Sequence, residues 1–389
     1  MPVASLAAVV LAVSAVVLAV SAARATPAGE RAPAPPDAAP RPAALVRVWK
    51  GYVDAFVTAD GRVMDPKRDG LTTSEGQTYC LVQAVWADDP ETFDRVHAWT
   101  RTHLQGGDPS ALPAWAWGRR PDGSLGPIDP QPASDADQLL AWALLLAARR
   151  WGRPALVDEA RGVLGRIWAE EVRTLGPHLV LLPGPWAGTA DPVLLNPSYF
   201  LPFALRDFAA ADPSHDWDRL RRDGYTLLEG WMAGGALPPD WVSVDATTGA
   251  RVDDPPSRPG DRAHGYEAIR LPWALAADAA WNAEPRADAL LAPWAVLAAR
   301  WTETGFLPAR MAADGTGLED YEEPAMMGAL LPAWERVAPA AAAALYRTEL
   351  RPRRQRPGWA GPDDYYAQNW IWFGLALWSG LARPLPQVG

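Results

Sequence analysis

Three short segments of the sequence place carboxyl groups where they could exchange protons with a bound molecule. The first, TTSE, ends at Glu75; the second, ASDAD, is centred on Asp135; the third, GYEAIR, contains Glu267 and ends at Arg270. A protonated carboxyl group can act as a general acid and an ionised one as a general base. Arg270, three residues after Glu267, can share its helix face and keep that carboxylate charged. The three segments therefore favour acid–base chemistry.

Each segment also has a structural interpretation that needs no substrate. Thr72 or Ser74 can cap a helix, and Glu75 would then complete a capping box. Ser134 and Asp137 can form a second box, which leaves the central aspartate of ASDAD at a helix N-terminus, where the helix dipole favours it. The third segment can form an ordinary surface ion pair. We expect Glu75 to point into a groove, because a side chain folded back onto its own helix is not free to protonate a substrate.

Aromatic side chains form a second set of candidates. The chain has 21 Trp against 7 Phe and 9 Tyr. An indole is a wide apolar plate with a polar edge, which suits the faces of sugar rings, although a large core also takes Trp and a GC-rich coding bias would raise its number. The candidates for stacking lie in loops or at expected helix starts: Trp115, Trp117, Tyr199, Trp241, Tyr365 and Tyr366.

The composition argues against several classes of function. The formal net charge is −10 and the pI is about 5.1, so the chain lacks the excess of basic residues that nucleic-acid binding requires. The five His residues are scattered and form no His-Glu-x-x-His motif, so neither a metal nor a cofactor is expected. The single cysteine, Cys80, allows no intrachain disulfide and is expected in the core.

The elements that must position these residues are mostly helices, separated by loops rich in Pro, Gly and Asp. Helices in pairs, with long loops on one side that form a substrate groove, predict an all-α (α/α)6 barrel, or toroid. An α-solenoid ranks lower because no fixed sequence period appears. A short strand pair is expected around residues 179–183 and 241–252. The expected helices cover residues 44–57, 75–88, 91–105, 136–151, 155–173, 198–210, 215–231, 264–282, 285–301, 323–334, 337–347 and 363–381.

The N-terminal region is expected to direct export. Residues 5–22 are nearly all Leu, Ala, Val and Ser, and a small-x-small pattern precedes Thr26. We expect a signal peptide at 1–25, a Pro/Ala-rich linker at 26–43 and a single domain at 44–385. An uncleaved anchor is the alternative, because the start lacks Lys and Arg and the apolar run approaches the ~20 residues that span a bilayer. Both alternatives predict a secreted or periplasmic protein.

Taken together, these segments resemble glycoside hydrolase family 8, and within it the endoglucanases encoded with bacterial cellulose synthase. The motifs occur in the family's order: SEGQ followed by Tyr79, then LPAW ending at Trp115, then ASDAD and GYEAIR. The segment LNPSY, the tyrosine pair at 365–366 and the FG dipeptide at 373–374 are similar to family segments as well. The resemblance covers roughly residues 44–381. It implies an (α/α)6 barrel and an inverting endo-glycosidase acting on a β-1,4-glucan, without a cofactor or metal.

The resemblance also implies roles for individual residues. Glu75 matches the general acid, Asp135 matches a carboxylate that binds and distorts the sugar, and Arg270 matches the arginine beside the general base. The base itself falls on Glu267, where the family's endoglucanases usually have Asp. Glu is longer by about 1 Å, and an error of that size can cost ~100-fold in rate. Either Glu267 is the base with an adjusted backbone, or another carboxylate serves, or the enzyme is weak. The expected sugar-binding residues are Trp115, Trp117, Tyr199, Arg270 and Tyr366.

Two other functions stay open at this point. A family member that acts on chitosan, xylan or lichenan would keep the barrel and the acid and change the sugar-binding residues. A weakly active or non-catalytic glucan-binding protein of the synthesis machinery would keep the groove. The expected partners are a β-1,4-glucan and the cellulose synthase machinery, and the protein is expected to be a monomer.

Overall fold

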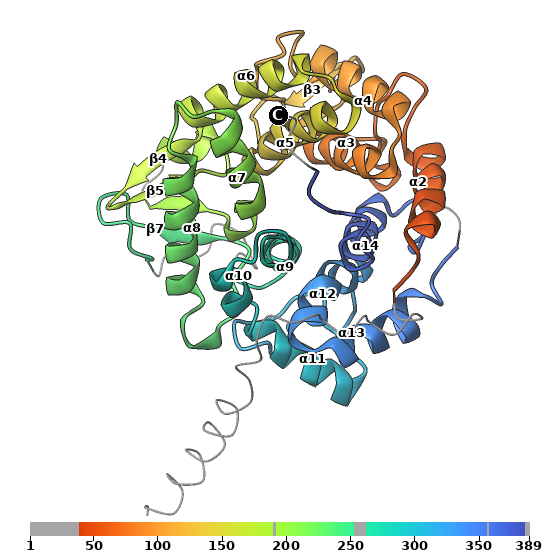
Figure 1. Ribbon diagram of the computed structural model, residues 1–389, viewed down its shortest axis with the longest axis vertical. Coiled ribbons are helices and arrows are strands. Elements are labelled where there is room, and N and C mark those ends of the chain that lie inside the picture. Colours follow the sequence, from red (N-terminus) through yellow and green to blue (C-terminus); the bar gives the residue numbers. More distant parts are fainter. Residues whose placement is uncertain (1–38, 190–191, 253–261, 356–357, 386–389) are drawn as a thin grey trace, which may run out of the picture. The chain divides into compact units, whose positions relative to one another are not determined.

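The computed structural model describes residues 39–189, 192–252, 262–355 and 358–385. Within these residues the helices form an inner and an outer ring around one axis, along which Figure 1 looks. The inner ring contains α3 (Ser74–Ala87), α5 (Ser134–Trp151), α7 (Pro202–Ala211), α9 (Arg270–Asn282), α12 (Pro324–Val337) and α14 (Tyr365–Trp378). The outer ring contains α2 (Pro42–Phe56), α4 (Pro90–His103), α6 (Ala155–Glu170), α8 (Trp217–Trp231), α10 (Pro285–Leu290), α11 (Pro293–Thr304) and α13 (Pro339–Leu345). This arrangement is the predicted (α/α)6 barrel.

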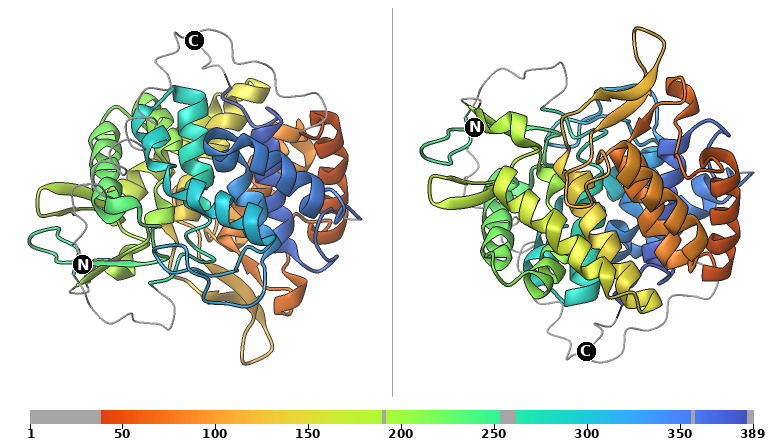
Figure 2. Two further views of the ribbon diagram at one scale, coloured as in Figure 1. Left: turned by 90° about the horizontal axis from the view of Figure 1, so that it is seen from below. Right: turned by 90° about the horizontal axis from the view of Figure 1, so that it is seen from above.

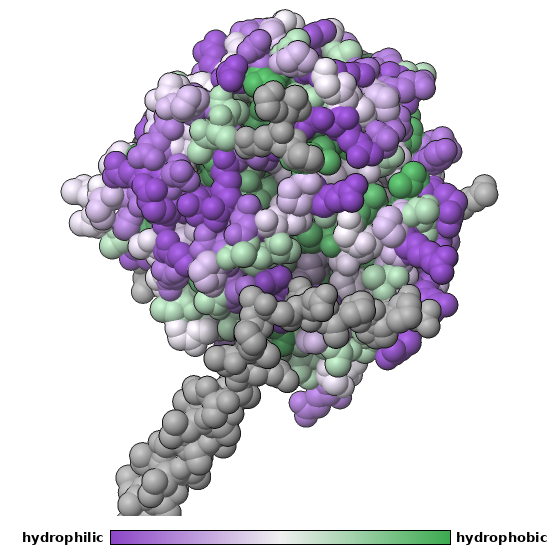
Figure 3. All heavy atoms as spheres, viewed as in Figure 1, coloured by the Kyte–Doolittle hydropathy of each residue, from purple (hydrophilic) through white to green (hydrophobic). Residues whose placement is uncertain are grey.

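The sequences of the two rings differ as their positions require. Inner helices are apolar on all sides, and in α3 every residue except Glu75 is buried. Outer helices bury one stripe: α8 buries only Trp217, Leu220, Tyr225 and Leu228, which recur at helical spacing. Hydrophilic side chains accordingly cover most of the face of the molecule shown in Figure 3. The only partly exposed residue of α3 is thus one of the acid–base candidates.

Most predicted helices are confirmed within a few residues, and the differences have local causes. The helix predicted at 285–301 is two helices, α10 and α11, because Pro293 lacks the N–H that would continue the first one. The helices predicted at 198–210 and 264–282 begin later, as α7 and α9. Tyr199 therefore lies in a short 3-10 helix, Pro197–Tyr199, before α7, and Glu267 lies in the turn before α9.

The helix α2 begins at Pro42, inside the linker predicted at 26–43, because proline suits the first turn of a helix. The predicted signal peptide at 1–25 and most of that linker lie outside the described residues. Among the residues that the structure describes, no helix is both long and apolar enough to cross a membrane.

Three small antiparallel sheets connect the helices, and the predicted pairing of 179–183 with 241–252 is wrong. The first sheet has β1 (Thr72–Thr73), β2 (Ala116–Arg119) and β3 (Leu125–Asp129). The second pairs β4 (Val172–Leu175) with β5 (His178–Leu181), and the third pairs β6 (Val193–Leu195) with β7 (Val242–Val244). A tight turn at Gly176 favours the local β4–β5 hairpin over the distant partner. Figure 2 shows the β2–β3 hairpin standing out from one end of the barrel.

Tryptophan fills the centre of the barrel, so most of its excess belongs to the core. Trp86 from α3, Trp142 from α5, and Trp273 and Trp281 from α9 pack ring against ring with centroids 5.7 to 6.3 Å apart. Their polar edges are satisfied: the Trp273 indole donates to the Phe373 carbonyl at 2.9 Å. This aromatic packing closes the barrel beneath the loops that carry the candidate residues.

The inner helices α12 and α14 approach closely at two glycines. A Cβ atom on Gly374 would overlap the carbonyl oxygen of Gly328. We expect Gly374→Ala to lower the free energy of unfolding by about 1–3 kcal/mol, because the helices must separate. Urea denaturation measures the loss. The control is Gly165→Ala in α6, where a Cβ would meet open space and stability should rise by roughly 0.5–1 kcal/mol. Equal effects of the two changes would contradict this account.

Candidate active site

The first candidate, Glu75, is placed by the pairing of β1 with β2. Thr73 pairs with Ala116, and the Ser74 N–H donates to the Trp115 carbonyl at 2.9 Å. This brings the Trp115 indole beside Glu75, where its Nε1 donates to Glu75 Oε1 at 3.1 Å. The carboxyl group is therefore oriented by a neighbouring strand.

The cap of α3 settles the structural interpretation of this segment. Thr73 is the capping residue, and its hydroxyl accepts from the Gly76 N–H at 3.2 Å. The expectation that Thr72 or Ser74 would cap the helix is therefore wrong. Glu75 makes no capping-box bond to the N–H of Thr73; its carboxyl oxygens are engaged by Trp115 and Ser74. The carboxyl group thus does not close a capping box; Oε1 is held by Trp115 from the neighbouring strand segment and Oε2 by the Ser74 hydroxyl at 3.4 Å.

The second candidate, Asp135, lies in the first turn of α5 and is 4% exposed. Its Oδ1 accepts from the Ala136 N–H at 2.9 Å, and its Oδ2 accepts from Arg270 Nη1 at 2.6 Å. The predicted capping box of Ser134 and Asp137 is wrong, because α5 begins after Ala133 without any side-chain cap. Asp137 is instead turned into the interior and fully buried.

Arg270 joins the second and third candidates, because its guanidinium binds Asp135 with Nη1 and Glu267 Oε2 with Nη2. The Tyr199 ring covers the same guanidinium with its centroid 4.9 Å away. Burial raises the pKa of Asp135, the Arg270 guanidinium opposes that rise, and the carboxyl of Glu75 adds to it. Burial also lowers the pKa of Arg270, but Asp135 together with Tyr79, Tyr199 and Tyr366 outweighs burial and holds this pKa well above its ordinary value. Arg270 therefore carries a fixed positive charge between two carboxyl groups.

Two residues that the sequence analysis did not single out hold Glu267 in place. The Asn196 amide donates to Glu267 Oε2 at 3.0 Å, and its own Oδ1 accepts from Ser198, which fixes the orientation of the amide. Asp240 Oδ1 accepts the N–H groups of Gly265, Glu267 and Ala268 at 2.8 to 3.2 Å, which anchors the turn before α9. Burial raises the pKa of Asp240 to about 6, and these backbone N–H groups oppose the rise.

Asn196 and Asp240 meet because β6 pairs with β7. Asn196 follows β6, Asp240 comes two residues before β7, and Leu195 pairs with Val242. No spacing in the sequence indicates this pairing, so only the register of the strands brings the two side chains to Glu267.

Glu267 and Asp135, the two carboxylates bound by Arg270, differ in solvent exposure, and this indicates different roles. The side chain of Glu267 is 33% exposed, and that of Asp135 is 6% exposed. A general base must contact a water molecule, so Glu267 is the better candidate for that role. Asp135, held by Arg270 and nearly sealed from solvent, is suited to a fixed binding function.

The structure brings some of the predicted sugar-binding aromatics to this site, but not Trp117. Trp117 is 8% exposed and packs against Trp99 and His103, with the Arg62 guanidinium 4.3 Å from its ring. A stacking platform needs an exposed ring face, so the prediction for Trp117 is contradicted. Trp115 precedes β2, and the register with β3 shifts between Ala116 and Trp117, so the two rings do not share one face as they would along a regular strand, and only Trp115 reaches Glu75.

Tyr199 and Tyr366 lie beside the charged group. Tyr366 donates its hydroxyl to the Tyr266 carbonyl at 2.6 Å, next to Glu267 in the chain. The Trp241 ring lies next to the Tyr199 ring, with centroids 6.1 Å apart. The Trp186 ring, whose residue is 43% exposed, lies next to the Trp241 ring, with centroids 6.4 Å apart. These rings form a row that leads away from Arg270. The loop between α6 and α7 supplies Trp186, which the sequence analysis did not identify.

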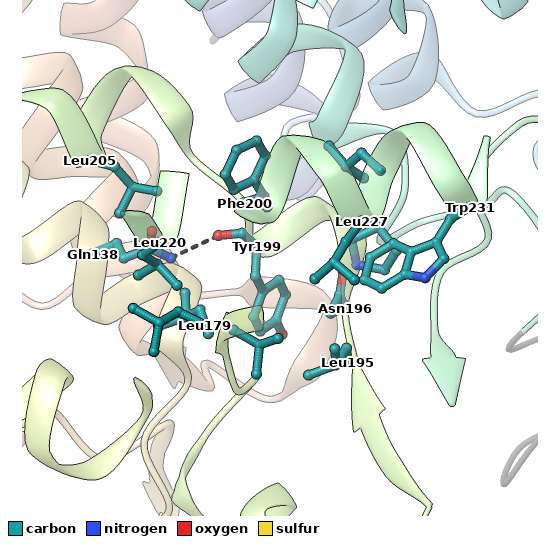
Figure 4. A pocket seen from close by; sticks show the side chains of 15 residues that line it. Gln138, Leu179, Leu195, Asn196, Tyr199, Phe200, Leu205, Leu220, Leu227 and Trp231 are labelled. Carbon is teal, nitrogen blue, oxygen red and sulfur yellow. Dashed lines mark hydrogen bonds between the residues drawn. The ribbon is translucent and has the colours of Figure 1, made fainter. Parts of the chain in front are cut away.

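Tyr199 also borders a mostly apolar pocket behind the site (Figure 4). Gln138 from α5 donates its amide to the Tyr199 carbonyl at 2.8 Å, shown as the dashed line, and to the Ser134 carbonyl at 2.9 Å. The start of α5, which carries Asp135, is therefore tied to the loop that carries Tyr199. No group of three or more His, Cys, Asp or Glu residues within the described ranges is placed to hold a metal ion.

Comparison with known proteins agrees with this geometry. Residues 6–317 match the family model described as glycosyl hydrolases family 8. The chain belongs to this family. The three carboxyl-bearing segments and the Asn196 segment all fall within the matched part of this family 8 chain.

Relatives with sequence similarity are named endoglucanases. The family 8 chain is 38% identical over 229 residues to an endoglucanase of Xanthomonas axonopodis pv. citri, an alignment that covers 58% of each protein. It is 34% identical over 240 residues to a probable endoglucanase of Novacetimonas hansenii, covering 59% of this chain and 66% of that one. The chain thus matches less than two thirds of the length of either relative.

Similar solved structures have the same fold, and they cover a larger share of this chain than the sequence alignments do. The crystal structure of an endo-1,4-D-glucanase from Vibrio fischeri is similar with a TM-score of 0.74 and 29% identity, covering 85% of this chain and 94% of that one. A family 8 endoglucanase of Klebsiella pneumoniae is similar with a TM-score of 0.68 and 27% identity, covering 86% and 99%.

Proposed function

We propose that the protein is an inverting endo-β-1,4-glucanase that hydrolyses a cellulose-like glucan. The observation that carries the proposal is the arrangement around Arg270. One buried guanidinium holds a sealed carboxylate, Asp135, and a partly exposed one, Glu267, while Glu75 stands apart with only neutral partners. The names of the similar proteins support the choice of a β-1,4-glucan as substrate.

The proposed reaction needs two carboxyl groups with different tasks. Glu75, oriented by Trp115, donates its proton to the glycosidic oxygen as the bond to the anomeric carbon breaks. Glu267 takes a proton from a water molecule, whose oxygen attacks the anomeric carbon from the opposite side. The water must fit between base and sugar, so inverting enzymes have carboxyl separations of ~6.5–9.5 Å.

The binding groups have separate tasks in this reaction. Asp135 accepts sugar hydroxyl hydrogen bonds, and Arg270 favours its ionised form against the effect of burial. Tyr366 and Trp115 offer ring faces or edges to successive sugars, whereas Tyr199, 8% exposed like Trp117, packs its ring over the Arg270 guanidinium. No metal or cofactor takes part.

Glu267 can serve as the base in this proposal because neighbouring side chains hold its carboxylate and the backbone of its turn in place. Asn196 and Arg270 both bind Oε2, which leaves Oε1 for the water. Asp240 accepts hydrogen bonds from the backbone N–H groups of the turn, including that of Glu267, and so fixes the backbone from which the longer side chain extends. The one-methylene difference from the usual aspartate is thus accommodated by the loop.

The decisive experiment measures reducing ends released from carboxymethylcellulose, lichenan, chitosan and xylan, and follows the product anomer by proton NMR. We expect the highest rate on the β-1,4-glucan, with the inverted α-anomer formed first. Glu267→Gln should lower kcat by roughly 10²–10⁴-fold, because an amide cannot accept the proton of the water.

The matched control is Glu229→Gln, which removes a similar charge from an ion pair with Arg286 on the outer helix α8. It should leave kcat unchanged. Full activity of Glu267→Gln would reject Glu267 as the base. Binding of the glucan without any chain shortening would reject the enzyme and favour a glucan-binding protein.

We propose further that the protein is exported by the segment at residues 1–25, acts as a monomer in the periplasm or outside the cell, and accompanies cellulose synthesis. N-terminal sequencing of the mature protein tests the first point, and sedimentation tests the second. Copurification with the synthase subunits tests the third.

A further inference from the structure

Two carboxyl groups outside the proposed reaction are sealed in the interior next to the site. Asp137 in α5 and Glu171, the residue after α6, are both 0% exposed. They lie within hydrogen-bonding reach of each other. No N–H or O–H group of the described residues donates to any of their four carboxyl oxygens. Two ionised carboxylates cannot bond to each other, so the contact requires a proton between them.

The charges around the pair favour this proton. Asp135 on α5, Glu75 on α3 and Glu170 on α6 all add negative charge. Arg173 on β4 is the cation on this side, and it acts on Glu171 from a partly exposed position. The helix dipole at the start of α5 offsets only part of one charge. Two buried negative charges without a cation would be far more costly than one proton held from solvent.

The position of the pair connects it to the catalytic residues. Asp137 lies two residues after Asp135 in the first turn of the same helix. Glu171 begins the β4–β5 hairpin, and its carbonyl accepts from the Leu182 N–H at 2.9 Å. The Pro183 carbonyl in turn accepts from the Ser134 N–H at 3.1 Å. The pair therefore fastens the hairpin to the turn that carries Asp135.

We propose that Asp137 and Glu171 share a proton that positions the first turn of α5, and that deprotonation of the pair sets the alkaline limit of hydrolysis. Asp137 and Glu171 are positioning residues, because they act through Asp135 and not on the sugar. When the pair loses a proton to solvent, it gains a buried negative charge, and the cost of that charge loosens the contact between α5 and the hairpin. The catalytic part of this inference rests on the proposed glucanase function.

Thermal unfolding tests the shared proton without any substrate. Burial raises the pKa of Glu171 to about 8. The folded protein keeps this proton up to a higher pH than the unfolded chain does. The free energy of unfolding is therefore greatest below the pKa of Glu171 in the unfolded chain, and it falls as the pH rises from there toward 8. The folding equilibrium constant should fall about tenfold per pH unit for one proton. Glu171→Gln supplies an amide donor to Asp137 and should remove this slope.

The matched control is Glu170→Gln, one residue earlier, whose carboxylate is exposed and pairs with Arg166. It makes the same change of charge and should keep the slope of the wild type. If Glu171→Gln and Glu170→Gln gave equal slopes, the shared proton would be rejected. A transition temperature of the wild type that rises with added Na⁺, K⁺ or Ca²⁺ would also reject it, because a bound cation would then hold the pair.

Two further readouts make the result independent of how well the variants fold. The infrared spectrum of the wild type should contain the band of a buried protonated carboxyl at pH 7 that weakens as the pH rises past about 8, because Glu171 ionises there while burial holds the pKa of Asp137 well above its ordinary value. Absence of this band at pH 7 would overturn the proposal. In kcat against pH, Glu171→Gln and Asp137→Asn should extend the alkaline limb upward with KM little changed, and an unmoved limb would reject the positioning role.

These outcomes separate this inference from the proposed function. A protein that hydrolyses no glucan would refute the glucanase, while the unfolding slope and the infrared band would still report the proton. A protein that hydrolyses glucan with an unmoved alkaline limb would refute only the positioning role.

Discussion

Replacement of Glu75 by Gln is expected to lower kcat on a soluble β-1,4-glucan by roughly 10²–10⁴-fold. The amide keeps the size of the side chain and can still meet the Trp115 indole, but it cannot donate an acidic proton to the leaving oxygen. KM should change little, because the rings that hold the sugars are untouched. The measurement is the initial rate of reducing-end release over a range of substrate concentrations.

Glu91→Gln is the matched control for this experiment. Glu91 occupies the second position of α4, as Glu75 does in α3, but it is exposed on the outer ring. Both changes replace a carboxyl group in the first turn of a helix by an amide of the same size. Only Glu75→Gln should lose activity. A Glu75→Gln variant that keeps more than half of the wild-type kcat would show that Glu75 is not the acid. An aryl glucoside with a good leaving group should partly restore its rate.

Replacement of Arg270 by Leu has the second largest expected effect, on stability and activity together. The change leaves the Asp135 carboxyl buried without its cation, and breaking such a pair costs about 3–5 kcal/mol of unfolding free energy. Glu267 loses the same partner and the orientation that it provides. We expect kcat to fall by roughly 100-fold or more among the molecules that remain folded, since small displacements of reacting groups are costly. Denaturation and kinetics at low temperature measure the two effects.

Arg206 provides the control, because it also holds two carboxylates, Asp278 at 3.0 Å and Glu284 at 2.6 Å, away from the site. Arg206→Leu should lower stability by a similar amount and leave kcat of the folded protein unchanged. Arg270→Lys should fall between the wild type and Arg270→Leu, since one ammonium cannot present a fork of donors to two carboxylates. If Arg206→Leu reduced kcat as much as Arg270→Leu, the loss would reflect unfolding rather than catalysis.

Local pattern alone did not distinguish the acid from a helix cap. The spacing of Thr72, Ser74 and Glu75 fits a capping box, and only the ordered set of other motifs favoured catalysis. In the structure Thr73 takes the capping role by itself, and the pairing of β1 with β2 gives Glu75 a different partner. A two-residue strand is too short to leave a pattern in the sequence.

The sequence by itself determined most of the helices and indicated the candidate residues. Helices in pairs, separated by loops rich in Pro, Gly and Asp, are enough to predict a double ring, because each helix must bury its apolar face against its neighbours. The carboxyl groups of Glu75, Asp135 and Glu267, with the arginine after the last, were identified from residue type and motif order.

Only the tertiary structure decided which side chains meet. Asn196 and Asp240 reach Glu267 through the register of β6 and β7, and Asp137 meets Glu171 across two helices. Trp117 turns into the core while Trp115 reaches the acid, although they are two residues apart. These contacts join segments distant in the chain, and their free energy depends on burial and on the distance between charges. Burial and the distances between charges are set only when the barrel folds, so the pattern of the sequence cannot predict these contacts.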